Sequence, residues 1–90
     1  MADQIIILDS ARKRGYEDDD LLHVVAFAVR EYHQDDELVM FVGADQAGRL
    51  MEVGTITLRD GKTAIVHAMR PPAKRYRDHI RLTQSKEERT

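Results

Sequence analysis

The sequence of 90 residues contains no cysteine and no tryptophan, and only two prolines. Without cysteine the chain forms no disulfide framework and no thiolate zinc site, and it has no cysteine nucleophile. Its longest apolar stretch, residues 24–29, is much shorter than the roughly 20 residues that a membrane-spanning helix needs. The N-terminal region carries Asp3 and Asp9 instead of the basic start of an export signal. We therefore predict a cytoplasmic protein with no membrane segment.

Several recurrent catalytic motifs are absent as well. The sequence has no glycine-rich phosphate loop, nucleophile elbow or dinucleotide fingerprint, so kinase, hydrolase and dinucleotide-binding functions have no support. The spacing of His23, His33, His67 and His79 matches no regular zinc-binding pattern. The acidic run 17–20 is not followed by an EF-hand-like loop, so it indicates a helix start instead of a metal site. We predict neither a metal nor a cofactor.

The remaining composition is that of a globular chain, with 42% hydrophobic and 33% charged residues. A chain of this length supports one hydrophobic core. We predict a single domain over residues 1–83, followed by a flexible polar tail at 84–90.

Charge is distributed unevenly along the chain. Residues 1–48 hold four basic and eleven acidic side chains, whereas residues 49–90 hold ten basic and five acidic ones. The segment from Arg70 to Arg81 is the most basic, and Asp78 is its only acidic residue. A surface of this sign attracts phosphate. The plainer interpretation is that these cations only keep a surface segment solvated.

Local patterns predict two N-terminal helices. Asp9 and Ser10 are plausible caps for a short helix over 11–14, which Gly15 ends. The acidic residues 17–20 lie at the positive end of a second helix that continues to Arg30 and is apolar around most of its circumference. The short apolar run 5–8 is compatible with an edge strand.

Alternating patterns after residue 30 predict strands. Residues 38–42 and 49–59 alternate, and Asp60-Gly61 is a strong hairpin signal between the second of these strands and residues 62–69. Tyr32 and His33 are compatible with the start of a further strand. Helices followed by strands predict an α+β fold with two N-terminal helices on a three- to four-stranded antiparallel sheet.

Pro71-Pro72 ends the last strand, because proline donates no ladder hydrogen bond. Beyond it, Lys74, Arg77 and Arg81 recur at helical spacing, which fits a short C-terminal amphipathic helix that presents three cations together. A frayed tail fits the same residues.

His67 is the strongest candidate for a catalytic group. Strict alternation along residues 62–69 places it on the same face as Ile65 and on the opposite face from Ala68. A single histidine among apolar residues is more often structural. Its sequence neighbours, however, are the groups that metal-free phosphodiester cleavage needs, namely cations for the phosphate and a phenol for proton transfer. They are Arg49, Arg70, Lys74, Arg75 and Tyr76, with Arg77 and Arg81 following.

Glu52 is unusual because it occupies an otherwise apolar face of its strand. One interpretation makes it a cross-strand partner for an arginine. The other makes it a positioned base or the residue that orients His67. No spacing rule separates the two.

Three segments resemble the BrnT-like branch of the RelE/ParE superfamily of bacterial toxins, over about residues 9–77. Residues 11–23 are similar to the helical start "K-H-G-V-S-x-E-D" of such proteins. Residues 47–54 are similar to their "G-R-x-x-x-V" strand, and residues 65–70 to their "I-I-S/H-A-R/M" strand. The chain departs from the family in being slightly acidic and in having Pro71-Pro72 before the basic tail.

The resemblance implies a RelE-like domain, with two helices on a twisted antiparallel sheet, that acts as an RNA endonuclease and is silenced by a cognate antitoxin. It implies catalytic roles for His67, Arg70, Glu52 and Tyr76. RNA, including ribosome-associated mRNA, is the implied substrate. The implied RNA-binding residues are Arg49, Lys74 and Arg75, and the charge and helical spacing of the same segment add Arg77 and Arg81 as RNA-binding candidates.

Two functional hypotheses follow. In the first, the protein is a toxin and a metal-independent endoribonuclease in which His67, Arg49 and Arg70 surround one hollow. In the second, it is a noncatalytic RelE-like module that binds a protein or a nucleic acid. A gyrase poison, known from a related branch, is a further alternative.

Overall fold

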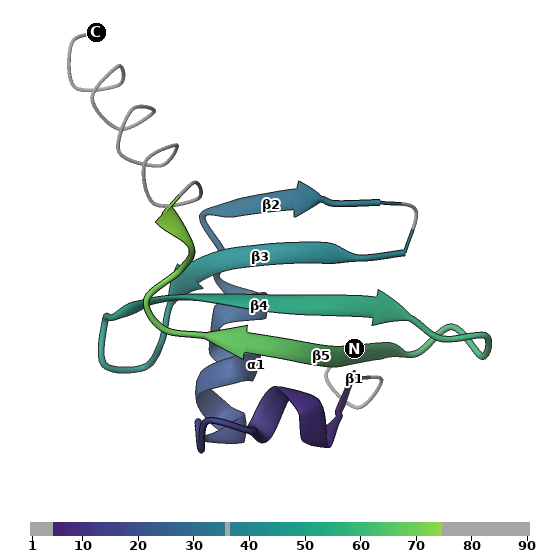
Figure 1. Ribbon diagram of the computed structural model, residues 1–90, viewed down its shortest axis with the longest axis horizontal. Helices are drawn as coiled ribbons and strands as arrows, with labels where there is room; N and C mark the ends of the chain where they lie inside the picture. Colours follow the sequence, from purple (N-terminus) through teal and green to yellow (C-terminus); the bar gives the residue numbers. More distant parts are fainter. Residues whose placement is uncertain (1–4, 36, 75–90) are drawn as a thin grey trace, which may run out of the picture.

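Five strands form one mixed sheet in the computed structural model, which describes residues 5–35 and 37–74 (Figure 1). The elements in chain order are β1 (Ile5–Ile7), the 3-10 helix η2 (Asp9–Arg12), α1 (Asp18–Ala26), β2 (Arg30–His33), β3 (Val39–Ala44), β4 (Leu50–Thr57) and β5 (Thr63–Met69). Across the sheet the strands lie in the order β1, β5, β4, β3, β2. Neighbouring strands are antiparallel except β1 and β5, which are parallel. Helix α1 covers one face of this sheet.

The prediction of two helices on a three- to four-stranded antiparallel sheet is wrong. The described residues form one α-helix, one 3-10 helix and five strands. The expected first helix is only the single turn η2, and Gly15, with φ at +76°, reverses the chain soon after it. The apolar run at the N-terminus supplies β1, which adds to the sheet edge by pairing Ile5 with Thr63 in parallel.

The second helix ends earlier than its apolar pattern predicts. Phe27 already has a non-helical backbone, with φ at −122°, and follows Ala26 as the C-cap. The Val29 N–H then donates to the carbonyl of Val42 at 2.8 Å, and Arg30 pairs with the same residue in the sheet. Pairing with β3 therefore takes residues 29 and 30 out of the helix.

The hairpin predicted at Asp60-Gly61 is confirmed, because β4 and β5 are antiparallel neighbours. Gly61 has φ at +88°, a conformation that glycine adopts without strain. The Asp60 carboxylate accepts a hydrogen bond from the N–H of Lys62 at 3.1 Å. The turn residues thus fix the register of β4 and β5 next to the turn.

The main core lies between α1 and the sheet. Its fully buried members come from η2, α1, β4 and β5, and partly buried side chains from β1 and β3 complete it. Helix and sheet approach closely at Gly43, where an added Cβ would lie 2.9 Å from the Cα of Ala28. The buried members are Ala11, Leu21, Val24, Met51, Val53, Ile65 and Ala68.

A β-bulge interrupts the alternation of β5. The register with β4 shifts between Gly54 and Thr55, so that Gly54 pairs with His67 while Thr55 pairs with Ile65. Ile65 and Ala68 consequently belong to the same core cluster beneath α1. The prediction that His67 shares a face with Ile65 is therefore wrong. His67 lies on the other face of the sheet, which we call the second face.

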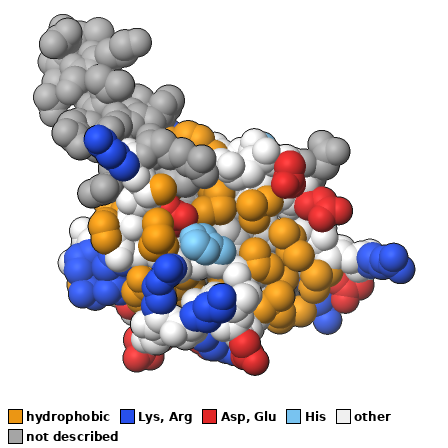
Figure 2. Space-filling model, viewed as in Figure 1, with side chains coloured by type: hydrophobic (Ala, Val, Ile, Leu, Met, Phe, Trp, Pro, Cys, Tyr) orange, Lys and Arg blue, Asp and Glu red, His pale blue; other side chains and the backbone are white. Residues whose placement is uncertain are grey.

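The second face carries a smaller cluster in which Met40 and Val42 are buried. After β5 the chain turns back across the end of the sheet (Figure 1) and brings Ala73 against this cluster. Pro72 is fully buried within the returning segment. Figure 2 shows this face, with an imidazole lying among hydrophobic side chains and basic side chains close by.

Neither helix in the described part of the chain is long and apolar enough to span a bilayer. The predicted tail at 84–90 and the amphipathic segment after Lys74 lie outside the described residues.

The close approach at Gly43 is testable with two single-methyl additions. We expect Gly43→Ala to lower the free energy of unfolding by about 2 kcal/mol, because the new methyl group meets the backbone at Ala28, just after α1. In Gly54→Ala the nearest atom, at 2.9 Å, is the movable sulfur of Met40, with His67 Cβ at 3.3 Å, so the loss should be smaller. Urea unfolding of both variants checks this ranking. An equal or larger loss for Gly54→Ala would contradict it.

Candidate functional site

His67 and Glu52 form a close pair on the second face. Glu52 in β4 pairs with Met69 in β5, and Gly54 pairs with His67, so the two side chains project from adjacent positions of neighbouring strands. The His67 Nε2 lies 2.8 Å from Glu52 Oε2. The Glu52 side chain is only 5% exposed, whereas that of His67 is 40% exposed. A buried carboxylate thus holds an imidazole that reaches solvent.

Glu52 also anchors the segment that returns across the sheet. Its second oxygen, Oε1, accepts a hydrogen bond from the Ala73 N–H at 2.6 Å. Both carboxylate oxygens are therefore used, which offsets the cost of burying the group. Of the two interpretations offered by the sequence, the structure favours orientation of His67 over pairing with an arginine.

The pair assigns distinct roles to the two ring nitrogens of His67. A carboxylate accepts hydrogen bonds, so a neutral imidazole beside it carries its proton on Nε2 and donates it to Glu52. Nδ1 then holds the free lone pair, and it forms no hydrogen bond with residues 5–35 or 37–74. The exposed nitrogen is therefore able to accept a proton from a bound molecule.

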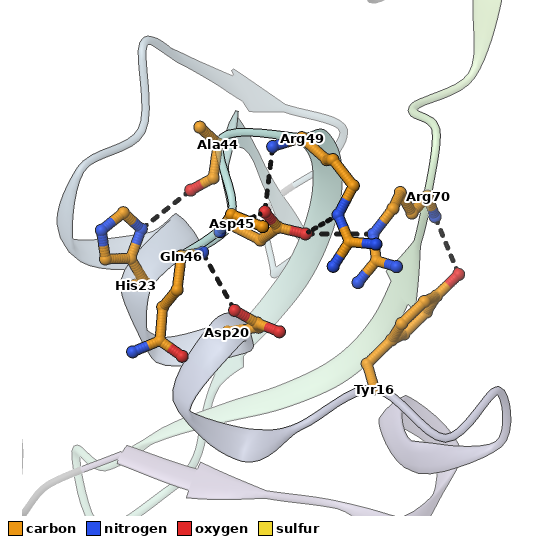
Figure 3. Close-up of polar contacts among 9 residues, drawn as sticks. Tyr16, Asp20, His23, Ala44, Asp45, Gln46, Arg49 and Arg70 are labelled. Carbon is orange, nitrogen blue, oxygen red and sulfur yellow. Dashed lines mark hydrogen bonds and ion pairs between the residues drawn. The ribbon is translucent and has the colours of Figure 1, made fainter.

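Arg49 and Arg70 meet at a second buried carboxylate, that of Asp45 (Figure 3). Asp45 Oδ1 accepts hydrogen bonds from the N–H groups of Ala47 and Arg49, each at 2.9 Å. Its Oδ2 accepts the Arg49 Nε–H at 3.1 Å. The Arg70 Nε lies at the same ion-pair distance from Oδ2 but is not aligned as a hydrogen bond. The Asp45 side chain itself is fully buried.

The environment of Asp45 favours its charged form. Burial alone would raise the pKa of this carboxyl group. The hydrogen bonds from the backbone of Arg49 and Ala47, together with the charges of Arg49 and Arg70, outweigh burial and hold the pKa below its ordinary value. The carboxylate therefore stays ionised at neutral pH and fixes both guanidinium groups.

Further contacts hold this group rigidly at the helix side of the sheet. The Arg70 guanidinium lies over the Tyr16 ring, with Cζ 4.9 Å from the ring centroid. The Tyr16 hydroxyl accepts the Arg70 N–H at 2.9 Å. On the other side of the loop, Asp20 in α1 accepts the Gln46 N–H at 2.9 Å (Figure 3).

The structure does not bring the expected cations around the imidazole. Tyr16, beneath the Arg70 guanidinium, packs against the core under α1, whereas the pair of His67 and Glu52 lies on the second face with Ala73. His67 and Glu52 are thus together, and Arg49 and Arg70 are together. The sheet separates the two groups, so a single hollow lined by all four does not form.

Lys74 is exposed and follows Ala73, the residue bound to Glu52, so it lies near the imidazole side. The remaining predicted site residues, Arg75, Tyr76, Arg77 and Arg81, lie outside the described residues.

Sequence reasoning missed three participants. Arg14 donates through Nη1 to the Ala68 carbonyl at 3.1 Å, which brings a cation beside β5 next to His67. Asp45 sits between Gly43 and Gly48, where an aspartate that caps a turn is common, and this was a usable signal. No local sequence pattern identified Tyr16, because its role depends on a contact with Arg70, which is 54 residues away in the sequence.

Within the described ranges, no group of three or more His, Asp or Glu side chains is arranged to hold a metal ion. Comparisons with protein-family models, with curated proteins and with solved structures found no match. The resemblance to BrnT-like toxins therefore stays a prediction.

The role of Asp45 predicts a specific response to acid. We expect Asp45→Asn to lower the free energy of unfolding at neutral pH by about 3 kcal/mol, because charge-assisted hydrogen bonds disappear and Arg70 keeps no buried partner. The folded-state pKa lies below the ordinary value of about 3.9, so this stabilisation is present above about pH 4 and is lost as the pH falls through the folded-state value.

Asp45→Asn should therefore lose less stability than the wild type when the pH is lowered from about 7 to about 3. Urea unfolding at both values measures the difference. Asp60→Asn, an exposed site in the β4–β5 turn, is the matched control and should behave like the wild type. A pH dependence of Asp45→Asn equal to that of the wild type would show that this carboxylate is not the group involved.

Proposed function

We propose that the protein is the toxin of a bacterial toxin-antitoxin pair, a metal-independent endoribonuclease that acts on RNA in the cytoplasm. The observation that carries the proposal is the pair of His67 and the buried Glu52 at 2.8 Å, with the imidazole 40% exposed. A carboxylate that orients a histidine and leaves its other nitrogen accessible is the arrangement of a general base. The resemblance to BrnT-like toxins supplies the substrate class and the antitoxin partner.

The chemistry assigned to His67 is an internal transfer within RNA. Nδ1 removes the proton from a ribose 2′-hydroxyl, and the 2′-oxygen forms a bond to the adjacent phosphorus. The bond from phosphorus to the 5′-oxygen of the next nucleotide breaks, and the protonated imidazole returns its proton to that oxygen. The products are a 2′,3′-cyclic phosphate and a 5′-hydroxyl end. Glu52 holds the ring and stabilises the imidazolium that forms in between.

Arg14 and Lys74 are described cations close to His67 and to the Ala73 anchor, and we assign to them the attraction of the phosphate. Arg14 is bound to the carbonyl of Ala68, directly after His67, and Lys74 follows the Ala73 anchor. Arg49 and Arg70 are committed to Asp45 on the helix side, so we do not assign them to the reacting phosphate.

A noncatalytic binding module is the second candidate function. This candidate is favoured because Arg49 and Arg70 are both ion-paired with Asp45 on the helix side, whereas His67 lies on the second face. In this function the Glu52 and His67 pair serves only to fix the segment that ends at Ala73. Tight RNA binding that weakens steeply with salt, without any cleavage, would select this function.

An RNA cleavage assay with the purified protein distinguishes the two. We expect His67→Ala to reduce the cleavage rate by about 10²- to 10⁴-fold, because the general base is removed. Glu52→Gln should reduce it by about 10²-fold or more, since an amide donor favours the wrong imidazole tautomer. His33→Ala is the matched control, because His33 also lies beside a glutamate, Glu31 at 3.2 Å, but both are well exposed. Thermal unfolding of each variant confirms that it is folded.

Expression in bacteria without an antitoxin tests the biological role. The wild-type protein should arrest growth, and His67→Ala should relieve the arrest while His33→Ala should not. A wild-type protein that is harmless at high level and cuts no RNA would rule out the enzyme function.

A further inference from the structure

We infer that Arg49 and Arg70 form a phosphate-binding site on the helix side of the sheet, distinct from the site of His67. The two arginines lie at the open end of the antiparallel β4–β5 hairpin, one just before β4 and the other just after β5. Both place Nε 3.1 Å from the same oxygen of Asp45. Their guanidinium groups therefore lie side by side (Figure 3).

The outer edges of both guanidinium groups are free to bind an oxyanion. The one side-chain hydrogen bond to Asp45 comes from the Nε of Arg49, and within the described residues the η nitrogens of both arginines form no hydrogen bond and no ion pair with a residue other than Asp45. Each guanidinium carries five N–H donors in a planar fork, so most of them remain available. Arg49 is 56% exposed and Arg70 is 23% exposed, which gives a ligand access from solvent.

The site is held in place before any ligand arrives. Asp45 is fixed by two backbone N–H groups, and the face of the Arg70 guanidinium rests on the Tyr16 ring. Holding the side chains in their binding geometry removes much of the entropy cost of ordering them around an anion. Two neighbouring arginines on a protein surface repel each other through their like charges. Here the Asp45 carboxylate pairs with both guanidinium groups and keeps them close together.

The local charge balance favours an added anion. Two guanidinium groups face one carboxylate, which leaves a net positive charge at the cluster. The Asp20 carboxylate is not part of this ion-paired cluster, because its Oδ1 accepts the Gln46 N–H on the other side of the loop (Figure 3). Asp20 forms no ion pair with either arginine within the described residues.

Phosphate fits this site better than a carboxylate does. The paired forks present donors from two directions, and a tetrahedral phosphate offers oxygens to both, whereas one planar carboxylate matches a single fork. Arg70 follows His67 by three residues, about 10 Å at roughly 3.3 Å per residue. The identity of the bound phosphate rests on the proposed function. If the protein cleaves RNA, this site binds an RNA phosphate that flanks the cleaved one.

Titration with inorganic phosphate tests the site without any reference to cleavage. The guanidinium Nε–H signals of Arg49 and Arg70 should shift with phosphate and shift less with acetate at the same ionic strength. Arg49→Gln should weaken phosphate binding at least about tenfold, because charge-assisted hydrogen bonds to the anion no longer form. Arg59→Gln removes the same charge at an exposed position beyond the other end of β4 and should leave binding unchanged.

Binding of single-stranded RNA provides the second measurement, in a His67→Ala background that prevents cleavage. Arg49→Gln should lower the slope of log K against log salt by about 0.7, because the protein neutralises one phosphate fewer, and Arg59→Gln should not. Arg49→Lys keeps the charge without the fork and should recover only part of the phosphate affinity.

The outcomes separate this inference from the proposed function. If the wild type cuts no RNA but Arg49→Gln alone weakens phosphate binding, the site stands and the enzyme function fails. If the wild type cuts RNA while Arg49→Gln and Arg59→Gln bind phosphate equally, the site is overturned and the enzyme function stands. Acetate binding as tight as phosphate binding would also overturn the assignment.

Discussion

The hydrogen bond between His67 and the buried carboxylate of Glu52 is the interaction on which the second face of the sheet depends. A carboxylate that is only 5% exposed is costly unless its oxygens are bound, and here one binds the imidazole while the other binds the N–H of Ala73. The same side chain therefore orients a potential base and fixes the return of the chain after β5. Structure and chemistry are coupled at this position, because a change in Glu52 alters both.

A second carboxylate, Asp45, organises the opposite side in a similar way. It joins the loop after β3 to the end of β5 through Arg49 and Arg70, and burial makes it a fixed point for both. The sheet lies between the two carboxylates. The β-bulge opposite Gly54 and Thr55 contributes to this division, since it turns His67 to the face opposite Ile65. The molecule thus has two charged groups with different partners in place of the single hollow that the sequence predicts.

The parts of the fold that local chemistry determines could be predicted. Asp60-Gly61 requires a tight turn, so the central hairpin was predictable from two residues. The parallel pairing of Ile5 with Thr63 was not, because a three-residue apolar run carries no information about its partner. The bulge also left no clear signal, and one extra residue reversed the predicted orientation of His67 relative to Ile65. Glu52 was identifiable as a candidate because a charge on an apolar strand face needs a partner, although its second contact, with Ala73, depends on tertiary structure.

The most direct test of this account is the tautomer of His67, which long-range ¹H–¹⁵N correlation spectra of the imidazole report. In its neutral form, a ring that donates to Glu52 is protonated at Nε2 and carries a free lone pair on Nδ1. We predict this single tautomer for the wild-type protein. A ring protonated at Nδ1, or the mixture of tautomers found for a free imidazole, would contradict the claim that Glu52 orients His67 as a base.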